Sequence, residues 1–532
     1  MKADYKSLSL CFAGALCGTT GVQATEKTGA QQKPNIVFFL VDDMSWMDCG
    51  CYGSKFYETP NIDRLARDGV RFTNAYTACH VSSPTRASIM TGLYPASVGM
   101  TDYLPGRRNQ PSLRFLNHPN RQQLPDDEVT IAEALRNNGY RTALVGKWHL
   151  GEAPYGPTAR GFDEAIPSDW YGCCTPSFHP PFRMNGYDGE TGEYLTDLLT
   201  KEAVNYIERN RDHPFFLYMS HFAVHDPIQG RKDLVEKYKR KLASMPVPKG
   251  EPYILEGNPD EENPPGRKQL DDLLHTPEFE NQYKMLPHRT VKIKQHQDNA
   301  EFAAMVESMD ESLGIIRNKL EELGIAENTI IIFLSDNGGM SAANFYNPNR
   351  IIPNDRLDEA FASSNLPLRG AKGWLYEGGI RVPMIVFYPG VTQSGKVCDA
   401  PVISNDFYPT IVAMTSSVMP DGKICEGVNL MPLIEGKKKL PETRALYWHF
   451  PHYSNHGLQS PGGAIRLGDY KLIEYFENKT VQLFNLKKDL GELNDISTSN
   501  PKKVKELRDM LHGWQRSKGF DGLKPNPEWV KP

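Results

Sequence analysis

The feature that most restricts the fold of this chain is a set of uninterrupted apolar runs, each ending in polar residues. The stretches "NIVFFLVDD" (35–43) and "TIIIFLSDNGG" (329–339) are apolar almost throughout until their last few residues. A strand with one solvated face alternates apolar and polar residues, whereas a strand buried on both faces stays apolar. Two more such runs, "FFLYMSHFAVHDP" (215–227) and "VPMIVFYPG" (382–390), follow the same pattern. The runs therefore predict buried strands of a largely parallel sheet.

Helical patterns separate these strands. In "TPNIDRLARDGVRF" (59–72), Thr59 is a candidate N-cap, Pro60 suits the first helical position and Gly69 marks the stop. Thr130 and Glu133 have the spacing of a capping box. From about 298 to 323, apolar residues recur at helical spacing; they are Phe302, Met305, Val306, Met309, Leu313, Ile316 and Leu320. Strands that alternate with helices predict an α/β fold, with a mostly parallel central sheet flanked by helices.

Two shifts in pattern predict the domain organisation. Between about 228 and 297 the chain is polar and rich in proline, which predicts a long surface insertion rather than part of the core. After about 395, short period-two stretches around turns predict antiparallel hairpins, followed by a closing helix at 501–517. We therefore expect a catalytic α/β domain over 33–394 and a smaller C-terminal α+β subdomain, built on an antiparallel sheet, over 395–532.

The N-terminus has the pattern of a secretory signal peptide. Lys2 and Lys6 precede the apolar stretch "LSLCFAGALCG", and "VQA" (22–24) places small residues at the usual cleavage positions. We predict a signal peptide over 1–24 and a secreted or periplasmic protein; the alternative is a disordered tail, which Asp4 and the short apolar stretch favour. No later run approaches the ~18 apolar residues that a membrane span needs. The net charge of −5 argues against a nucleic-acid partner, but allows a locally basic pocket.

Polar groups follow the predicted strands at the points where the strands end. They are Asp42 and Asp43, Lys147 and His149, His225, and Asp336 with Asn337. Ligands of open α/β sheets bind beyond the carboxyl ends of the strands, so these groups are expected to converge. Each also has an ordinary structural explanation: the aspartates could cap a helix, "DNGG" could be a turn, and His149 could be a core histidine.

The chemistry of these groups divides into two sets. Asp42, Asp43, Asp336 and Asn337 offer only hard oxygen atoms, which suit Ca²⁺ or Mg²⁺ rather than zinc. The second set supplies cationic or titratable groups that suit a tetrahedral anion; it comprises Arg86, Lys147, His149, His225 and Lys372. A dication with oxygen ligands and a cationic cradle can together cleave a sulfate or phosphate ester.

Five sequence blocks resemble one family in its order. The segment "SSPTRASIMTG" (82–92) matches the signature C/S-x-P-S/T-R-x-x-x-x-T-G with Ser82 at the modified position. The other blocks are "GKWHLG" (146–151), "FAVHDP" (222–227), "SDNGG" (335–339) and "LRGAKGWLYEGGIRVP" (368–383). The chain thus resembles the type I, formylglycine-dependent sulfatases of the alkaline-phosphatase-like superfamily, and most closely the arylsulfatase A-like and N-acetylgalactosamine sulfatase-like members.

This resemblance implies a modified residue. A maturation enzyme of the anaerobic, serine-type route would oxidise Ser82 to Cα-formylglycine, whereas Cys79 lacks Pro and Arg at the required offsets. A serine that attacked sulfur would form a stable sulfate ester. The hydrated aldehyde carries two hydroxyls on one carbon, so that one can attack sulfur and the other can release sulfate by C–O cleavage.

The resemblance also implies a role for each site residue. Residue 82 is expected to be the nucleophile and, with Asp42, Asp43, Asp336 and Asn337, a ligand of one Ca²⁺ ion. Arg86 is expected to steady the hydrate, and Lys147 and Lys372 to hold the sulfate oxygens. His225, with or without help from Lys372, is expected to protonate the leaving oxygen, and His149 to accept the proton whose loss triggers sulfate release.

Two rival functions have tests of their own. A phosphomonoesterase or phosphonate hydrolase of the same fold would need more zinc ligands, and its rates on aryl phosphate and aryl sulfate would identify it. A sulfated-glycan-binding relative without catalysis would carry an unmodified Ser82.

The expected substrate is a sulfated glycan, cleaved in exo fashion at galactose or N-acetylgalactosamine; sulfated glucosamine or uronic acid is the alternative. Aromatic and polar loops are candidates for the sugar pocket, with Trp170 and Tyr171 as a platform and Arg350 for recognition, against the alternative of ordinary loop packing.

Overall fold

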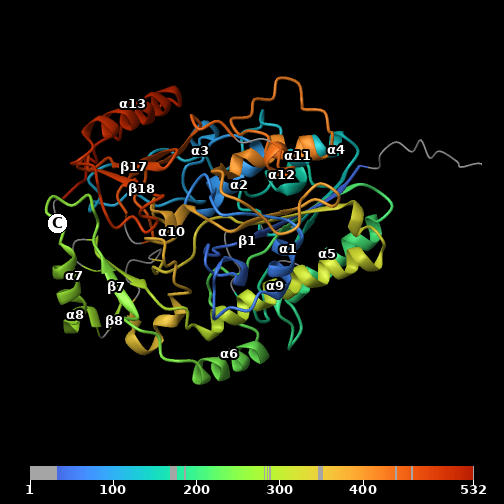
Figure 1. Ribbon diagram of the computed structural model, residues 1–532, viewed down its shortest axis with the longest axis horizontal. Coiled ribbons are helices and arrows are strands. Elements are labelled where there is room, and N and C mark those ends of the chain that lie inside the picture. The colour runs from blue at the N-terminus through green and yellow to red at the C-terminus, as the bar shows by residue number, and fades with distance from the viewer. Residues whose placement is uncertain are drawn as a thin grey trace, which may run out of the picture. The chain divides into compact units, whose positions relative to one another are not determined.

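The computed structural model describes residues 33–167, 177–184, 187–280, 282–283, 286, 289–344, 351–437, 440–456 and 459–530. Together, residues 33–532 form one compact unit (Figure 1). The predicted signal peptide and the candidate sugar-binding residues Trp170, Tyr171 and Arg350 lie outside the described residues. Within the described part, no helix combines the length and apolar character that crossing a bilayer requires.

A sheet of eight strands, in the order β13-β2-β12-β10-β1-β6-β4-β5, forms the centre of this unit. The strands are β1 (Asn35–Val41), β2 (Val70–Phe72), β4 (Arg141–Gly146), β5 (Glu164–Ile166), β6 (Phe215–Ser220), β10 (Thr329–Ser335), β12 (Met384–Phe387) and β13 (Lys396–Cys398). Among these eight, all but β12 run in the same direction. The prediction of a mostly parallel central sheet is confirmed.

Helices cover both faces of the sheet, which explains why its strands are apolar on both sides. Alternate residues of β1 enter two separate clusters: Val37 and Phe39 pack with α1, α5, α6 and α9, whereas Ile36 and Phe38 pack with α2, α4 and α11. Figure 1 shows these two layers on opposite sides of β1. The helices are α1 (Pro60–Asp68), α2 (Ser82–Thr91), α3 (Pro95–Val98), α4 (Ile131–Asn137), α5 (Leu195–Asn210), α6 (Lys232–Ser244), α9 (Ala300–Glu322), α11 (Phe407–Met414) and α12 (Met431–Ile434).

The predicted helix termini are largely confirmed. The capping box of Thr130 and Glu133 is formed at the start of α4. The start of α1 differs in one respect, because the Thr59 side chain does not cap it. Asp310 of α9 does so instead: its carboxylate accepts the backbone N–H of Asn61 at 3.1 Å and that of Ile62 at 2.8 Å. A carboxylate supplied by another helix cannot be recognised from the local sequence.

The segment 228–297 is not merely a surface insertion, and this prediction needs correction. Leu234, Val235 and Tyr238 of α6 belong to the main core cluster. This amphipathic helix, whose apolar residues lie on one face, was not predicted because the proline-rich stretch after residue 245 dominates the composition of the segment. The rest of the segment forms short elements: β7 (Tyr253–Glu256), α7 (Arg267–Leu274), α8 (Pro277–Glu280), β8 (Gln282–Tyr283) and β9 (Val291–Lys294). Strand β7 pairs with β9, and β8 with β11 (Ile352–Pro353).

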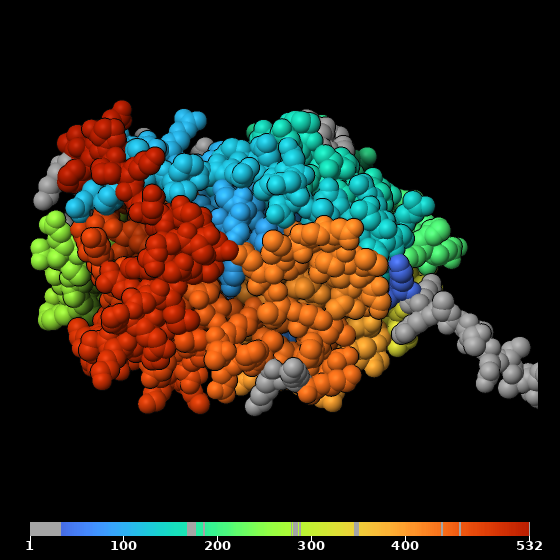
Figure 2. Space-filling model, turned by 90° about the horizontal axis from the view of Figure 1, so that it is seen from above, coloured from blue at the N-terminus to red at the C-terminus, as the bar shows by residue number. Residues whose placement is uncertain are grey.

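The C-terminal part contains the predicted antiparallel sheet, with the order β15 (Ala445–Phe450), β16 (Gly462–Leu467), β17 (Tyr470–Tyr475) and β18 (Val481–Asn485). The closing helix α13 spans Pro501–Ser517, as predicted. The residues just after 395 belong to the α/β layers, because β13 pairs with β2 and β14 (Val402–Ile403) pairs with β3 (Ala75–Tyr76). Figure 2 shows the C-terminal part in red against a light-blue segment around residue 115, where Leu116 donates to the Lys524 carbonyl.

Candidate active site

The predicted acidic residues meet where β1 and β10 end. These strands are parallel neighbours with Val41 opposite Ser335, so the residues that follow them emerge side by side. The backbone N–H of Asp43 donates to Oδ1 of Asp336 at 3.2 Å, and Nδ2 of Asn337 donates to Oδ1 of Asp43 at 2.8 Å. Asp42, Asp43, Asp336 and Asn337 are all fully buried.

Ser82 is the first residue of α2, a helix that is buried along its whole length. Its Oγ lies 3.2 Å from Oδ1 of Asp42 and 3.4 Å from Oδ1 of Asn337. The first turn of a helix carries partial positive charge, which favours anions near it. The signature segment therefore presents its hydroxyl to the acidic cluster from the positive end of a helix.

Three buried cations surround this hydroxyl and the carboxylates. Nζ of Lys147 lies 2.6 Å from Oδ2 of Asp42 and 3.1 Å from Oγ of Ser82. Nζ of Lys372 lies 2.7 Å from Oδ2 of Asp43, and NH2 of Arg86 lies 2.8 Å from Oδ2 of Asp336. Burial alone would lower the pKa of Arg86, but the charges of Asp336 and Asp42 raise it.

The close approach of β4 to β6 positions Lys147. Gly146 has φ 107°, and a Cβ at this position would lie 1.9 Å from the carbonyl oxygen of Ser220. The Ser220 hydroxyl accepts from NH1 of Arg86 at 2.5 Å and donates to the Lys147 carbonyl at 2.7 Å. Ser220 thus links Arg86 to the end of β4; it was missed by the sequence analysis, although its place at the end of β6 is the same signal that identified the others.

His225 reaches the cluster from the loop after β6. Its Nε2 lies 3.5 Å from Oδ2 of Asp43, and its Nδ1 lies 2.7 Å from Oδ1 of Asp226. Burial lowers the pKa of His225, but the charges of Asp43 and Asp226 outweigh burial and raise it well above its ordinary value. Asp226, which orients the ring, is a second residue that the sequence analysis missed.

His149 lies two residues beyond Lys147 and contacts a different part of the chain. Its Nε2 lies 2.8 Å from the Leu104 carbonyl, so this nitrogen carries the proton. Its φ of 58°, like the 63° of Asp43, lies in the left-handed region. That region costs a non-glycine residue roughly 1–2 kcal/mol, and such backbone strain is concentrated at functional sites.

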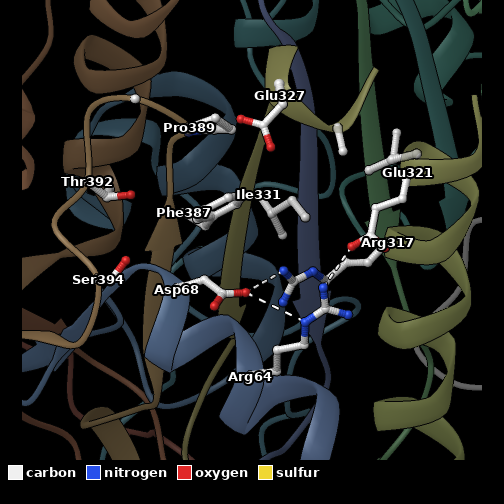
Figure 3. A pocket seen from close by; sticks show the side chains of 13 residues that line it. Arg64, Asp68, Arg317, Glu321, Glu327, Ile331, Phe387, Pro389, Thr392 and Ser394 are labelled. Carbon is white, nitrogen blue, oxygen red and sulfur yellow. Dashed lines mark hydrogen bonds and ion pairs between the residues drawn. The ribbon is translucent and has the colours of Figure 1, made fainter. Parts of the chain in front are cut away.

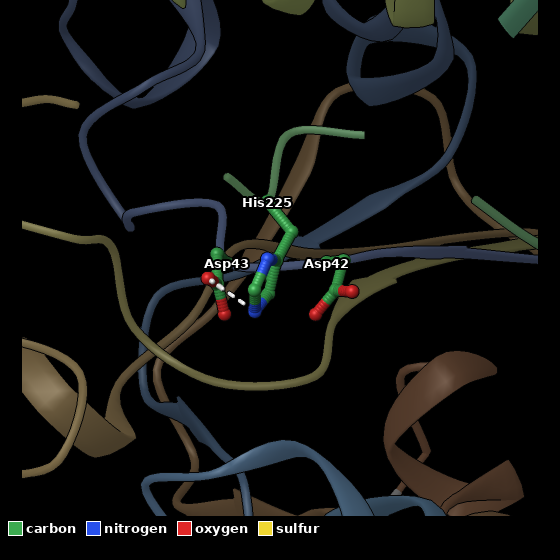
Figure 4. A group of neighbouring side chains, drawn as sticks. All are labelled: Asp42, Asp43 and His225. Atoms are coloured by element: carbon green, nitrogen blue, oxygen red, sulfur yellow. Dashed lines mark ion pairs between the residues drawn. The ribbon is translucent and has the colours of Figure 1, made fainter. Parts of the chain in front are cut away.

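The acidic cluster can hold a metal ion. Ligand atoms of Asp42, Asp43 and His225 lie within 4.8 Å of one another (Figure 4). Asn337 directs its Nδ2 to Asp43, which leaves its Oδ1 on the side of Ser82. The aspartates and Asn337 offer a buried set of oxygen atoms, which fits a hard dication.

Contacts in the structure therefore join most of the predicted site. They connect Asp42, Asp43, Ser82, Arg86, Lys147, His225, Asp336, Asn337 and Lys372. His149, two residues after Lys147, instead contacts the carbonyl of Leu104. The catalytic roles of all these residues stay predictions.

A separate cavity of about 400 Å³ contains none of these residues (Figure 3). It lies near the start of β10, at Ile331, and therefore away from the strand ends that carry the cluster. Four of its charged side chains form ion pairs with each other: Arg317 lies 2.6 Å from Asp68, and Arg64 lies 2.8 Å from Glu321. The chemistry of the site is not located there.

Comparison with known proteins identifies the family. The Sulfatase family model matches residues 34–417. The chain belongs to the sulfatase family. It is therefore a sulfuric ester hydrolase, as the five sequence blocks predicted. A second model, N-sulphoglucosamine sulphohydrolase, C-terminal, matches residues 371–517 of this sulfatase.

Relatives align along most of this sulfatase. It is 29% identical to a sulfatase of Formosa agariphila, over 94% of this chain and 91% of the relative. It is 29% identical to human N-acetylgalactosamine-6-sulfatase, over 77% of this chain and 67% of the relative. The crystal structure of Ps i-CgsB in complex with k-i-k-neocarrahexaose is similar with a TM-score of 0.68 and 26% identity, covering 94% of this chain and 95% of that one.

Proposed function

We propose that this sulfatase removes O-sulfate from a carbohydrate, with Ser82 converted to Cα-formylglycine as its nucleophile. The observation that carries the proposal is the position of the Ser82 hydroxyl, between Asp42 and Asn337 and 3.1 Å from Nζ of Lys147. A serine used only for structure does not require a buried ammonium and an acidic cluster at its hydroxyl. Oxidation of Ser82 removes two hydrogen atoms and is assigned to a separate serine-type maturation enzyme.

Asp42, Asp43, Asp336 and Asn337, with residue 82, are proposed to hold one Ca²⁺ ion; Mg²⁺ accepts the same oxygen ligands. The ion would neutralise part of the charge of the ester and lower the pKa of a hydroxyl at residue 82. His225 contributes a nitrogen beside these ligands, and nitrogen is a poor ligand for calcium, so we assign it to proton transfer instead.

The cations of the chain are proposed to bind the sulfate group. Lys147 reaches the cluster from the end of β4, and Lys372 from the "LRGAKGWLYEGGIRVP" segment. Both can donate hydrogen bonds to sulfate oxygens, where negative charge grows as the ester bond breaks. Arg86, held by Asp336 and Ser220, orients residue 82. The hydrated aldehyde supplies one hydroxyl for attack on sulfur and another for release of sulfate.

Two histidines are proposed to transfer protons. His225, oriented by Asp226, protonates the oxygen of the leaving alcohol. His149 keeps a proton on Nε2 through the Leu104 carbonyl, so Nδ1 is the nitrogen that accepts the proton whose loss releases sulfate.

We propose sulfated galactose or N-acetylgalactosamine as the sugar, cleaved in exo fashion. Similarity to human N-acetylgalactosamine-6-sulfatase supports this choice of sugar. Similarity to Ps i-CgsB, which was crystallised with an oligosaccharide, supports a carbohydrate substrate in general. The C-terminal match to the N-sulphoglucosamine sulphohydrolase family supports the alternative, a sulfated glucosamine. A panel of singly sulfated monosaccharides and disaccharides, assayed with protein produced together with a maturation enzyme, distinguishes them. Sequencing the N-terminus of the exported protein tests the proposed signal peptide over 1–24 and the secreted or periplasmic location.

Replacement of the proposed nucleophile is the decisive test. Ser82→Ala removes the only oxygen that can become the aldehyde, so we expect no detectable turnover of any sulfate ester. The matched control is Ser83→Ala, an adjacent buried serine whose hydroxyl accepts from the Leu104 backbone at 3.1 Å. We expect the control to keep most of the activity and to show the loss of two hydrogens at Ser82 by mass spectrometry. Near-normal hydrolysis by Ser82→Ala would refute the mechanism.

The same preparation tests the two rival functions. Among the described residues, one group of three metal-binding side chains was found, Asp42 with Asp43 and His225, whereas a two-zinc phosphatase needs more such ligands. Faster hydrolysis of aryl phosphate than of aryl sulfate would favour a phosphatase. An unmodified Ser82 in protein from its native source would favour a binding protein without catalysis.

A further inference from the structure

His456 brings the C-terminal part of the chain into contact with the cluster. It lies between β15 and β16 and is only 4% exposed. Gly373, the neighbour of Lys372, has φ 84°, and a Cβ at this position would lie 2.4 Å from Cβ of His456. His456 therefore packs directly against the backbone that carries the sulfate-binding lysine.

The backbone of His456 is firmly held, whereas its ring is not. Its backbone N–H donates to Oγ of Ser454 at 3.0 Å, and its backbone forms an isolated antiparallel β-bridge with Asn344. Neither ring nitrogen of His456 has a hydrogen-bond partner among the described residues. Leaving a buried polar atom unpaired costs about 1–3 kcal/mol, so a buried imidazole with two such atoms requires an explanation.

Other buried histidines of the same segment do have partners. His452 lies 2.8 Å from Oγ1 of Thr101, and His449 lies 3.2 Å from Nε2 of Gln515. His80 also lacks partners on its ring nitrogens, but it packs edge-on against the Phe450 ring at 4.2 Å and is completely buried. His456 thus combines unpaired nitrogens with a position beside the cationic site.

The surroundings of His456 indicate what it can bind. Burial, and then the charge of Lys372, lower the pKa of His456 well below its ordinary value; Asp226 and His225 are also within electrostatic reach. A neutral imidazole has one donor and one acceptor nitrogen. Sulfate oxygens only accept hydrogen bonds, whereas a sugar hydroxyl both donates and accepts.

We propose that His456 is a substrate-binding residue, whose ring nitrogens hydrogen-bond a hydroxyl group of the sugar that carries the sulfate ester. Its backbone packs on Gly373, next to Lys372, and its ring is within electrostatic reach of His225, which the mechanism above assigns to the leaving alcohol. The C-terminal part thereby contributes to the choice of sugar, while the α/β layers bind sulfate. This inference rests on the proposed carbohydrate sulfatase function.

The test compares three variants on two substrates. His456→Phe keeps the ring but removes both nitrogens, and His456→Gln restores one donor and one acceptor. His452→Gln is the matched control, since His452 is buried in the same segment and has its partner in Thr101. The substrates are 4-nitrophenyl sulfate, which carries no hydroxyl, and the sulfated monosaccharide that the wild-type enzyme cleaves fastest in the panel.

We expect His456→Phe to lower kcat/KM for the sulfated sugar roughly ten- to one-hundred-fold, mainly through KM, as for a lost hydrogen bond that leaves its partner unpaired. Its kcat/KM for 4-nitrophenyl sulfate and its melting temperature should stay close to those of the wild type. His456→Gln should recover most of the activity on the sugar, which a role in proton transfer would not allow. In the control, His452→Gln, kcat/KM for the two substrates should change by the same factor.

An equal effect of His456→Phe on both substrates would overturn the inference and leave the proposed function intact. If His456→Phe does not fold, the result for His456→Gln decides: a loss confined to kcat, with unchanged KM for the sugar, contradicts sugar binding. Hydrolysis of 4-nitrophenyl sulfate by the wild type without hydrolysis of any sulfated sugar contradicts the proposed function itself.

Discussion

Two histidines, four positions apart at the end of one strand, have different fates in this sulfatase. His221 is completely buried, packs on the ring of Phe39 at 4.9 Å and lies 3.0 Å from Oγ of Ser312. Burial lowers its pKa to about 3, so it stays neutral and serves the core. His225 lies between two carboxylates at the cluster instead. The two side chains are chemically the same, and only their surroundings distinguish the core histidine from the proposed catalytic one.

Replacing each of these histidines should therefore affect a different property. His225→Gln removes the proposed acid, and we expect kcat on the sulfated sugar to fall by roughly 10²–10⁴-fold. The decrease should be smaller on 4-nitrophenyl sulfate, because 4-nitrophenolate leaves without protonation. His221→Leu should instead lower the free energy of unfolding by about 1–2 kcal/mol and keep kcat. Steady-state kinetics and urea unfolding measure both; a large loss of kcat in His221→Leu would contradict this division.

At the scale of elements, a buried ion network connects the C-terminal sheet to the segment that carries Lys372. Lys471 of β17 lies 2.9 Å from Glu377 of α10 (Glu377–Ile380) and 2.9 Å from Glu492. All three side chains are completely buried. Glu377 also accepts from the Tyr76 hydroxyl at 2.7 Å, so it is anchored from several sides. The network holds the end of the "LRGAKGWLYEGGIRVP" segment in place against β17.

The pKa values of the two carboxyl groups in this network are shifted in opposite directions. Burial would raise the pKa of Glu377, but Lys471 and Arg381 lower it to about 2, so it stays charged. Burial raises the pKa of Glu492 to about 7, and Lys471 offsets this only in part. Because the folded state binds a proton at Glu492 more tightly than the unfolded chain, its stabilisation is complete below the ordinary glutamate pKa and is lost as the pH rises through about 7.

We therefore expect Glu492→Gln to change the pH dependence of stability. The wild type should lose free energy of unfolding relative to this variant as the pH rises from about 5 to 8, since only the wild type must ionise a buried carboxyl group. Urea unfolding at several pH values measures the difference. Glu506→Gln on the exposed surface of α13 is the control. Its free energy of unfolding should change with pH in the same way as that of the wild type. A constant difference between Glu492→Gln and the wild type across this range would show that Glu492 is charged throughout.

The sequence predicted those elements whose signal is local. Apolar runs identified the buried strands, and the rule that parallel strands present their ends together predicted the meeting of Asp42 with Asp336. Helix α6 was missed because its stripe is short and followed by a proline-rich stretch. Asp310 as the cap of α1 and the packing of His456 against Gly373 were missed for another reason: each residue contacts a segment far away in the chain, and no local pattern encodes such pairing.

At the scale of the whole molecule, the proposed active site depends on the complete fold. The residues proposed for it extend from Asp42 to Lys372 along the chain, and the proposed sugar-binding residue His456 lies in the C-terminal part. They meet only when β1, β10, β4 and β6 are assembled in register. Three buried carboxylates, Asp42, Asp43 and Asp336, come together at this point. An ion that binds there binds the folded state alone, so its binding energy stabilises the entire unit.

Calcium binding should therefore be visible as a change in global stability. We expect protein stripped with EGTA to melt at a lower temperature, and added Ca²⁺ to raise its stability by about 2.7 kcal/mol when free calcium is one hundred times Kd. Asp336→Asn should abolish this rise, because it removes a charged ligand from the cluster. Asp310→Asn is the matched control: it also alters a buried carboxylate, the cap of α1, and should lower the starting stability while keeping the full response to calcium. Calcium-dependent melting of Asp336→Asn equal to that of the wild type would place the ion elsewhere. The comparison needs no activity measurement, provided that both proteins carry the same form of residue 82, serine or formylglycine.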